Sequence, residues 1–428
     1  MSKSEKAGTI SARPSPRGSY YGYVVVAAGF CVWFITWGMY QSFGIFFKPL
    51  VEEFRWSRAD TVFAFSLVSV VHACLNIVMG WLTDRLGPRV VVTVFGSTLG
   101  ISYLLLSRIT ELWQFQVFFA LAAVGNASST IPVMATIARL FVRKRAFMTS
   151  IVQSGVGLGG FVFAPLSAWL AVTYGWRSSY AVLGVIALVA IVISGFLIRR
   201  EPLEVGWLPD GEAGAAQPEA RKQDAGIQVS GLSLRQAVHA PLFWVLGGIF
   251  FAFGFCRSTF LPHMAAHVQD LGFSLVDGAK VVAILTVSSI LGRLGMGWAG
   301  NKTAFMVAFA LTALSLAWGM FTRQLWGLYL FAFVFGVAWG AQAVLRFTMV
   351  AETFGLRSIG LLMGVLAFVE SIAAATGSYL AGWVFDITGS YRPAFITGII
   401  ISLGAVGLAF LLKKGPNLDM PASDRSAA

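Results

Sequence analysis

Long apolar runs alternate with short polar or basic connections along the chain, and these runs predict membrane-spanning helices. Each is close to the ~20 residues that cross a bilayer core of about 30 Å as an α-helix, and their length and pattern differ from those of membrane β-strands. The chain is therefore expected to be an all-α membrane protein. The predicted spans are 21–47, 60–82, 89–107, 112–138, 147–172, 179–198, 241–263, 276–298, 304–322, 326–349, 359–384 and 393–412.

The stretch 199–240 is the only long polar interruption between spans, and its Gly-, Ala-, Glu- and Pro-rich composition is typical of a linker. Gly80-Trp81 near the end of the second span recurs as Gly297-Trp298 in the later half. This repeat predicts two pseudo-symmetric six-helix bundles in parallel orientation. The expected organisation is a tail 1–20, a bundle 21–198, a linker 199–240, a bundle 241–412 and a tail 413–428.

Composition agrees with a membrane protein. Of the 428 residues, 57% are hydrophobic and 12% charged, about half the charged share of a soluble domain. The net charge of +12 lies mostly in connections between spans, which excludes a nucleic-acid groove and favours the lipid interface. Lys and Arg concentrate in the connections that share a side with both termini, so both termini are predicted to be cytoplasmic. We expect a monomer in the cell (cytoplasmic or inner) membrane, with a specialised internal membrane as the alternative.

Four charged residues fall well inside predicted spans, where each costs about 2.5 kcal/mol or more unless it pairs or lines a cavity. They are Arg257, Arg293, Arg346 and Glu370. Arg293 is the strongest candidate for an anion site, because its planar guanidinium grips a carboxylate through two hydrogen bonds. The alternative is a structural pair between Arg293 and Glu370. Arg346 is near the inner end of its span, which favours a structural role at the interface.

The other titratable residues leave alternatives open. Arg257 either contacts the substrate or has a snorkelling or gating role. Glu370 either takes up a proton or stays ionised beside an arginine. His72 is a second candidate for proton coupling, against a plain hydrogen-bonding role. His263 and His267 flank the end of their span and are expected to be solvated.

Polar side chains within spans complete the predicted substrate site, with helix packing as the alternative for each. These candidates are Tyr40, Gln41, Asn126 and Ser289. The sequence has no Cys/His spacing of a metal site, no nucleotide-binding motif and no catalytic arrangement. We therefore expect no metal, no cofactor and no enzymatic activity, and transport driven by gradients of solute or protons.

The turn Gly80-Trp-Leu-Thr-Asp-Arg-Leu-Gly-Pro-Arg89 resembles the signature Gly-x-x-x-Asp-Arg-x-Gly-x-Arg of the major facilitator superfamily. The resemblance implies the major facilitator fold and a latch that holds the inner side while the cavity faces outward. A weaker copy follows the later apolar run. The gating residues implied are Gly80, Asp84, Arg85, Gly87 and Arg89, with Asn301 and Lys302 in the copy.

Within that superfamily, several segments resemble the monocarboxylate transporter and oxalate–formate antiporter branch. They are 47–58, 140–146, 205–211 and 382–391. In that branch an arginine of the eighth span binds the substrate carboxylate, and Arg293 matches it, while Ser289 stands where some relatives carry an acid. Glu370 stands in the region of a lysine that the oxalate carriers use.

The resemblance implies a secondary active transporter that moves a small organic anion, a mono- or dicarboxylate, by alternating access. Coupling is expected to be proton symport or anion exchange. The expected partners are the anionic substrate, protons and the lipid bilayer. Three alternatives are efflux of an amphipathic drug, transport of an anionic metal chelate, and a transporter-like sensor or scaffold that moves no solute.

Overall fold

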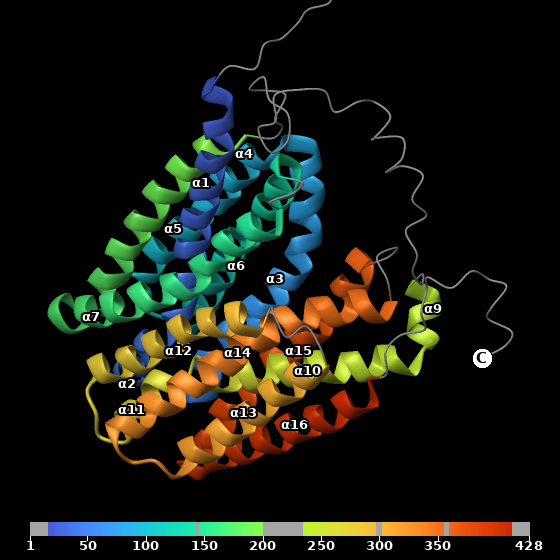
Figure 1. The fold of residues 1–428 in the computed structure, drawn as a ribbon. Helices are drawn as coiled ribbons and strands as arrows, with labels where there is room; N and C mark the ends of the chain where they lie inside the picture. Colours follow the sequence, from blue (N-terminus) through green and yellow to red (C-terminus); the bar gives the residue numbers. More distant parts are fainter. Residues whose placement is uncertain (1–15, 142–144, 200–233, 297–301, 355–358, 413–428) are drawn as a thin grey trace, which may run out of the picture.

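The computed structural model describes residues 16–141, 145–199, 234–296, 302–354 and 359–412, and the regular structure within these ranges is entirely helical (Figure 1). The helices of the N-terminal half are α1 (Pro16–Gln41), α2 (Phe43–Phe54), α3 (Arg58–Leu86), α4 (Pro88–Val90), the π-helix η1 (Val91–Phe95), α5 (Gly96–Leu106), α6 (Leu112–Leu140) and α7 (Arg145–Leu197). Those of the C-terminal half are α9 (Leu234–His239), α10 (Pro241–Phe260), α11 (Met264–Asp270), α12 (Leu275–Met296), α13 (Lys302–Phe321), α14 (Leu325–Phe354), α15 (Ile359–Thr388) and α16 (Arg392–Leu411).

Eleven stretches of the described chain are long and apolar enough to cross a membrane. One of them, in α7, contains two of the predicted spans. The helix breaks at Gly175, whose φ of 80° and ψ of 160° favour glycine because other residues rarely adopt a positive φ. A Cβ at this position would meet no atom within 4 Å, so backbone conformation rather than crowding favours glycine there. With this break, all twelve predicted spans have a helix.

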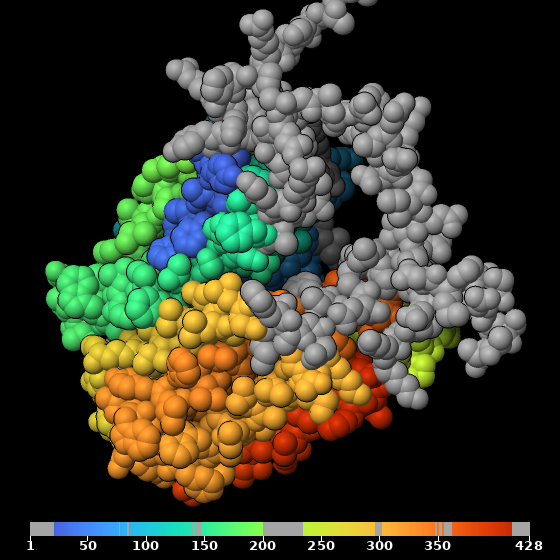
Figure 2. Space-filling view, viewed as in Figure 1, coloured from blue at the N-terminus to red at the C-terminus, as the bar shows by residue number. Residues whose placement is uncertain are grey.

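The two halves of the chain form two bundles that meet along two helix pairs. Helix α3 packs against α15, and α7 packs against α12. Figure 1 shows the N-terminal helices above the C-terminal ones, and in Figure 2 the green α7 surface lies against the yellow α12 surface. We call the end that carries Arg58, Asp270 and Asp386 the sealed end. The opposite end, where α1 and α10 begin, is the tail end.

Glycines, which have no side chain, let helices pack closely within and between the bundles. A Cβ on Gly159 of α7 would lie 2.1 Å from the carbonyl oxygen of Phe34, and one on Gly157 would lie 2.5 Å from Ile290 of the other bundle. Helices in lipid associate through such close van der Waals packing, because burial of apolar surface contributes little there. The glycines at 155–160 therefore allow α7 to approach both α1 and α12 closely. On α12, Gly292 is also crowded, while Gly295 has no neighbour within 4 Å.

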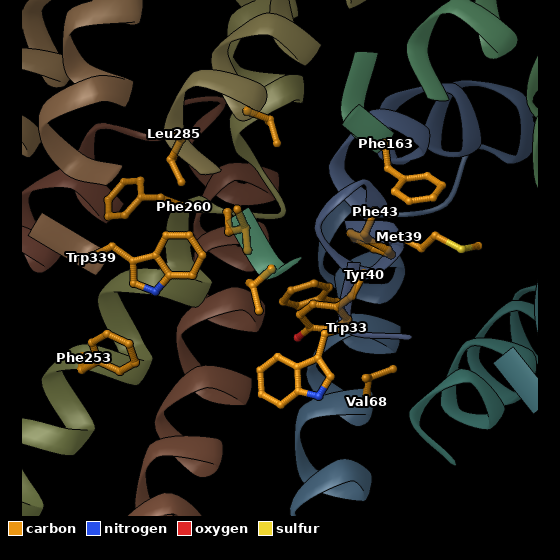
Figure 3. Packing of buried hydrophobic residues seen from close by; sticks show 14 of the residues in the cluster. Trp33, Met39, Tyr40, Phe43, Val68, Phe163, Phe253, Phe260, Leu285 and Trp339 are labelled. Carbon is orange, nitrogen blue, oxygen red and sulfur yellow. The ribbon is translucent and has the colours of Figure 1, made fainter. Parts of the chain in front are cut away.

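Apolar side chains fill the bundles and also cover their outer faces. Trp33 and Tyr40 of α1 face Phe253 and Trp339 of the C-terminal bundle across the centre of the molecule (Figure 3). Phe321, outside this core, is 71% exposed, which suits a surface that lipid covers. The predicted linker 199–240 ends in the six-residue helix α9, and residues 200–233 lie outside the described part.

Candidate functional site

Arg346 and Glu370 form an ion pair between α14 and α15, and both side chains are only 14% exposed. The Arg346 guanidinium also lies 4.1 Å above the ring of Phe253 on α10. Glu370 is thus the partner of Arg346, and the alternative pairing of Glu370 with Arg293 is wrong. The reason is geometric: Arg293 is turned toward α7, where it meets a backbone carbonyl.

Arg293 of α12 is half-buried where the two bundles cross. Its Nη1 donates a hydrogen bond of 2.9 Å to the carbonyl oxygen of Gln153 on α7, and its guanidinium lies 5.7 Å from the ring of Trp339. The Nε atom is buried without a hydrogen-bond partner. Among the described residues, no acidic side chain lies within ion-pair distance of Arg293. The site thus holds a cation whose charge the described protein leaves uncompensated.

Arg257 of α10 is a second half-buried arginine in this region. Its Nη2 donates only a long 3.4 Å bond to the Oγ of Ser258, and its Nε is buried without a partner. The charge of Arg257 acts electrostatically on Tyr40 and His72 in the opposite bundle. The structure therefore places Arg257 at the face between the bundles.

The N-terminal bundle presents an aromatic group toward Arg257. The rings of Trp37 and His72 meet edge-on with centroids 5.5 Å apart, and Trp37 contacts Tyr40 in the same manner at 5.7 Å. The Nδ1 of His72 is 3.4 Å from the Nδ2 of Asn76. Two further ring nitrogens, Trp37 Nε1 and His72 Nε2, are buried without partners.

The remaining residues of the predicted substrate site differ in how many of their polar atoms are already hydrogen-bonded within the protein. The Tyr40 hydroxyl is 3.4 Å from Ser69 Oγ. Gln41 donates to the carbonyl oxygen of Val156 at 2.8 Å, but its Oε1 has no partner, and the same holds for Asn126 Oδ1. Ser289 donates to the backbone oxygen of Thr286 at 2.6 Å. Ser289 is thus bound within its own helix, whereas Gln41 and Asn126 retain unpartnered acceptors.

A network across the bundles at the sealed end was not predicted from the sequence. Arg58 at the start of α3 forms two hydrogen bonds with the Asp270 carboxylate, 2.7 and 2.9 Å long, and a third of 2.7 Å to the Tyr391 hydroxyl. Asp386 accepts the backbone N–H groups of Arg58 and Ala59 at 3.0 and 2.8 Å. The signal was available, because Arg58, Asp386 and Tyr391 fall in segments that carry the family resemblance.

His263 is buried at the centre of this network, with 2% of its surface exposed, so the prediction of a solvated side chain is wrong. Its Nε2 lies 3.0 Å from the carbonyl oxygen of Ser378, and its Nδ1 lies 3.0 Å from the Tyr391 hydroxyl. Because a carbonyl only accepts, Nε2 carries the proton and Nδ1 accepts from Tyr391. Burial lowers the pKa of His263 to about 4. Burial likewise lowers the pKa of the half-buried His267 to about 4.

The predicted gating turn lies at the tail end. Gly87 adopts a φ of 83°, and its N–H donates to the carbonyl oxygen of Thr83, which ends α3. Arg85 lies 4.3 Å above the ring of Trp81, and Arg89 lies 5.0 Å above that of Phe196.

The other gating residues are less informative. A Cβ on Gly80 would make only an ordinary contact of 3.7 Å. Lys302 donates to the carbonyl oxygen of Phe410 at 2.5 Å. The side chain of Asp84 and the whole of Asn301 lie outside the described part of the structure.

Comparisons with known proteins agree with this architecture. Residues 25–303 match the sequence profile of the Major Facilitator Superfamily. The chain is 28% identical to monocarboxylate transporter 13 of Rattus norvegicus over 94% of this chain and 91% of that protein. It is 24% identical to monocarboxylate transporter 4 of Gallus gallus, with 94% and 85% covered.

Among solved structures, it resembles a bacterial homologue of the human lysosomal transporter Spinster in an inward-facing, occupied conformation. The TM-score is 0.70 at 16% identity, with 91% of this chain and 96% of that chain covered. At this identity the likeness concerns the fold alone.

Proposed function

The chain belongs to the Major Facilitator Superfamily, and we propose that it is a secondary active transporter of a small organic carboxylate. It is a multi-pass membrane protein whose relatives are transporters named for monocarboxylates. Proteins of this kind expose a site between two bundles alternately to the two sides of the membrane. The cargo class is a mono- or dicarboxylate, which enters the site as an anion.

The observation that carries this proposal is the uncompensated charge of Arg293. A guanidinium inside a membrane protein is costly unless a partner neutralises it. The described residues supply a backbone carbonyl but no carboxylate, and Nε has no acceptor. A substrate carboxylate provides both the missing charge and two acceptor oxygens in the geometry of the guanidinium edge.

The distribution of basic residues indicates which end of the protein faces the cytoplasm. If both termini are cytoplasmic, as the basic connections favour, the sealed end faces outward and the tail end faces the cytoplasm. The conformation described is then the inward-facing state. Arg257, Tyr40, Gln41, Asn126 and Ser289 are proposed as further residues that line the substrate site.

Coupling is proposed to involve Glu370, with His72 as the second protonatable group. In the inward-facing state the Glu370 carboxylate is held by Arg346. A proton on Glu370 would remove the charge that holds this pair, so proton uptake and rearrangement of α14 against α15 are coupled. In anion exchange, by contrast, the pair stays ionised and the cargo carries all the charge that moves.

Uptake into proteoliposomes tests the proposal. The purified carrier is reconstituted, and a panel of radiolabelled carboxylates is offered with and without a pH gradient. Arg293→Ala should abolish saturable uptake of every carboxylate that the wild type transports. Arg323→Ala, which removes an exposed arginine from the same bundle, is the matched control and should transport normally. Full carboxylate uptake by Arg293→Ala would contradict the role given to Arg293.

A further inference from the structure

Among the residues that the structure describes, two arginines rather than one lack an acidic partner at the face between the bundles. Of the three arginines within the described spans at this face, Arg346 is neutralised by Glu370. Arg257 and Arg293 have no acid within ion-pair distance in the part of the chain that the structure describes. The face therefore carries about two positive charges that the described residues do not balance, and a monocarboxylate would balance only half of them.

Arg257 lies about one helical turn from the level of the Arg346–Glu370 pair. Arg346 lies over the ring of Phe253, and a Cβ on Gly254 would lie 2.4 Å from the carbonyl oxygen of Glu370. Both contacts mark the same level of α10. Arg257 follows three to four residues later on α10, which is about 6 Å toward the sealed end.

Arg293 reaches nearly the same level from α12. A Cβ on Gly340 would lie 1.9 Å from the carbonyl oxygen of Ser289, which fixes α12 against the parallel helix α14. From that contact Arg293 is four residues further along α12 and Arg346 six residues further along α14, which is about 6 Å and about 9 Å toward the tail end. Arg293 and Arg257 thus lie about 3 Å and about 6 Å nearer the sealed end than Arg346. The two uncompensated arginines share a level within one helical turn.

Buried side-chain nitrogens without partners come from both bundles: Arg257 acts electrostatically on His72, and the His72 ring contacts that of Trp37. These nitrogens are Nε of Arg257, Nε of Arg293, Nε1 of Trp37 and Nε2 of His72. The two arginine nitrogens and the indole nitrogen only donate, and the histidine nitrogen donates when it carries the ring proton. Buried donors without partners are costly in a folded protein. A ligand that satisfies them must carry acceptor oxygens at two places, one beside Arg293 and one beside Arg257.

From this arrangement we infer that the cargo carries two anionic groups. One carboxylate binds Arg293, and the second is bound between the bundles by Arg257, with Trp37 and His72 donating from the N-terminal side. The inference rests on the proposed function and narrows it to dianions. It also gives Arg257 a specificity role, because Arg257 would make the carrier bind a dicarboxylate more tightly than a monocarboxylate with the same carbon skeleton. Because the second group contacts both bundles, a dianion stabilises the state in which α1, α3 and α10 approach one another.

Butyrate and succinate test the inference, because they share a carbon skeleton and differ in one carboxylate. Affinities are measured by isothermal titration calorimetry on the full-length purified carrier at neutral pH. The wild type should bind succinate roughly tenfold to a hundredfold more tightly, which is the range that one charged hydrogen-bonding group contributes. Arg257→Gln should lower succinate affinity to the butyrate level and leave butyrate affinity within about twofold of wild type. Arg293→Gln should abolish binding of both.

Three results would overturn the inference. The first is equal affinity of the wild type for the two ligands, and the second is a preference for butyrate. The third is an equal loss of both affinities in Arg257→Gln, which indicates a structural role for Arg257. If Arg257→Gln does not fold, Arg257→Lys keeps the charge without the fork and should retain part of the succinate preference.

Failure of this inference is distinguishable from failure of the proposed function. Arg293-dependent binding of butyrate without a succinate preference would remove only the second anionic group. If the wild type bound neither ligand, and no other carboxylate of the uptake panel, the proposed function would fall together with the inference.

Discussion

Asp386 at the end of α15 joins the two bundles by capping a helix of the other bundle. The first turn of α3 has N–H groups without helical partners. Ser57 Oγ accepts the N–H of Asp60, and the Asp386 carboxylate accepts those of Arg58 and Ala59. The start of α3 is thus satisfied in part by a residue more than 300 positions away. Because Asp386 and α3 belong to different bundles, opening of the sealed end would break both hydrogen bonds that Asp386 accepts.

The loss of this cap has a predictable magnitude. Replacing a capping side chain by Ala costs about 0.5–2 kcal/mol, and a carboxylate at a helix N-terminus contributes about 0.3–1 kcal/mol through the helix dipole. Asp386 is exposed, so water replaces part of what is lost, and we expect about 1–2 kcal/mol for Asp386→Ala. This shifts the ratio of closed to open sealed ends by roughly fivefold to thirtyfold.

Electron paramagnetic resonance measures this shift. Spin labels are placed at Arg108 and Gln324, two exposed positions in loops of opposite bundles at the sealed end, in a background without native cysteines. Asp386→Ala should move population from the short to the long distance. Asp277→Ala is the matched control, because Asp277 is bonded only within its own bundle, to Ser274 and Lys280. An unchanged distance distribution in Asp386→Ala, or an equal change in the control, would refute the reasoning.

Two further predictions concern protonation. Both ring nitrogens of neutral His263 are hydrogen-bonded, and burial lowers its pKa to about 4. Opening of the sealed end exposes the ring to water and restores a pKa of about 6.5. The ratio of closed to open sealed ends should therefore fall as the pH drops below about 6.5, by up to tenfold per pH unit down to about 4. His263→Gln should remove the share of this pH dependence that His263 contributes in the same spin-label measurement. The groups facing His263 are Arg58, Asp270 and Tyr391. An unaltered profile would assign the effect to His267, which contacts the Tyr391 ring and whose pKa burial also lowers to about 4. Glu370→Gln should abolish accumulation driven by a pH gradient but spare exchange in proteoliposomes; retained accumulation would exclude Glu370 from coupling.

The sequence alone predicted the helical spans, because length and apolar content decide whether a segment crosses a bilayer. It predicted 147–172 and 179–198 as separate spans, whereas α7 runs through both with a single non-helical residue, Gly175. Polar residues of the connection 173–178, among them Arg177 and Ser178, separate the two spans in the sequence, but hydropathy does not show that helix continues on both sides of a single residue. The glycine-mediated crossings at 155–160 were also predictable, because closely spaced glycines in an apolar helix have few other uses.

Pairing between distant side chains could not be predicted. From its depth in the membrane, Glu370 could pair with either Arg293 or Arg346. In the structure Arg293 points toward α7, so Arg346 is the partner of Glu370. His263 followed an apolar span at a position where side chains commonly meet water. Its partners Ser378 and Tyr391 are 115 and 128 residues away in sequence, so only the folded chain shows that the end of α15 covers it.

Asp84 and Asp386 occupy reciprocal places in the antiparallel pair α3 and α15. Asp386 lies at the end of α15 and caps the start of α3. Asp84 lies near the end of α3, at the tail end where α15 begins. If the tail end closes while the sealed end opens, a carboxylate near the start of α15 is stabilised by the same helix-terminal charge.

Asp84→Asn should therefore shift the spin-label distances at the sealed end toward closure, opposite to Asp386→Ala. Transport should fall because the outward-facing state is depopulated, while carboxylate binding should remain largely intact because Asp84 lies near the end of α3 and is not among the residues proposed to line the substrate site. The double variant Asp84→Asn with Asp386→Ala should recover a distribution close to wild type, because the two losses bias the equilibrium in opposite directions. A shift of Asp84→Asn in the same direction as Asp386→Ala, or a binding defect equal to that of Arg293→Ala, would contradict the reciprocal roles.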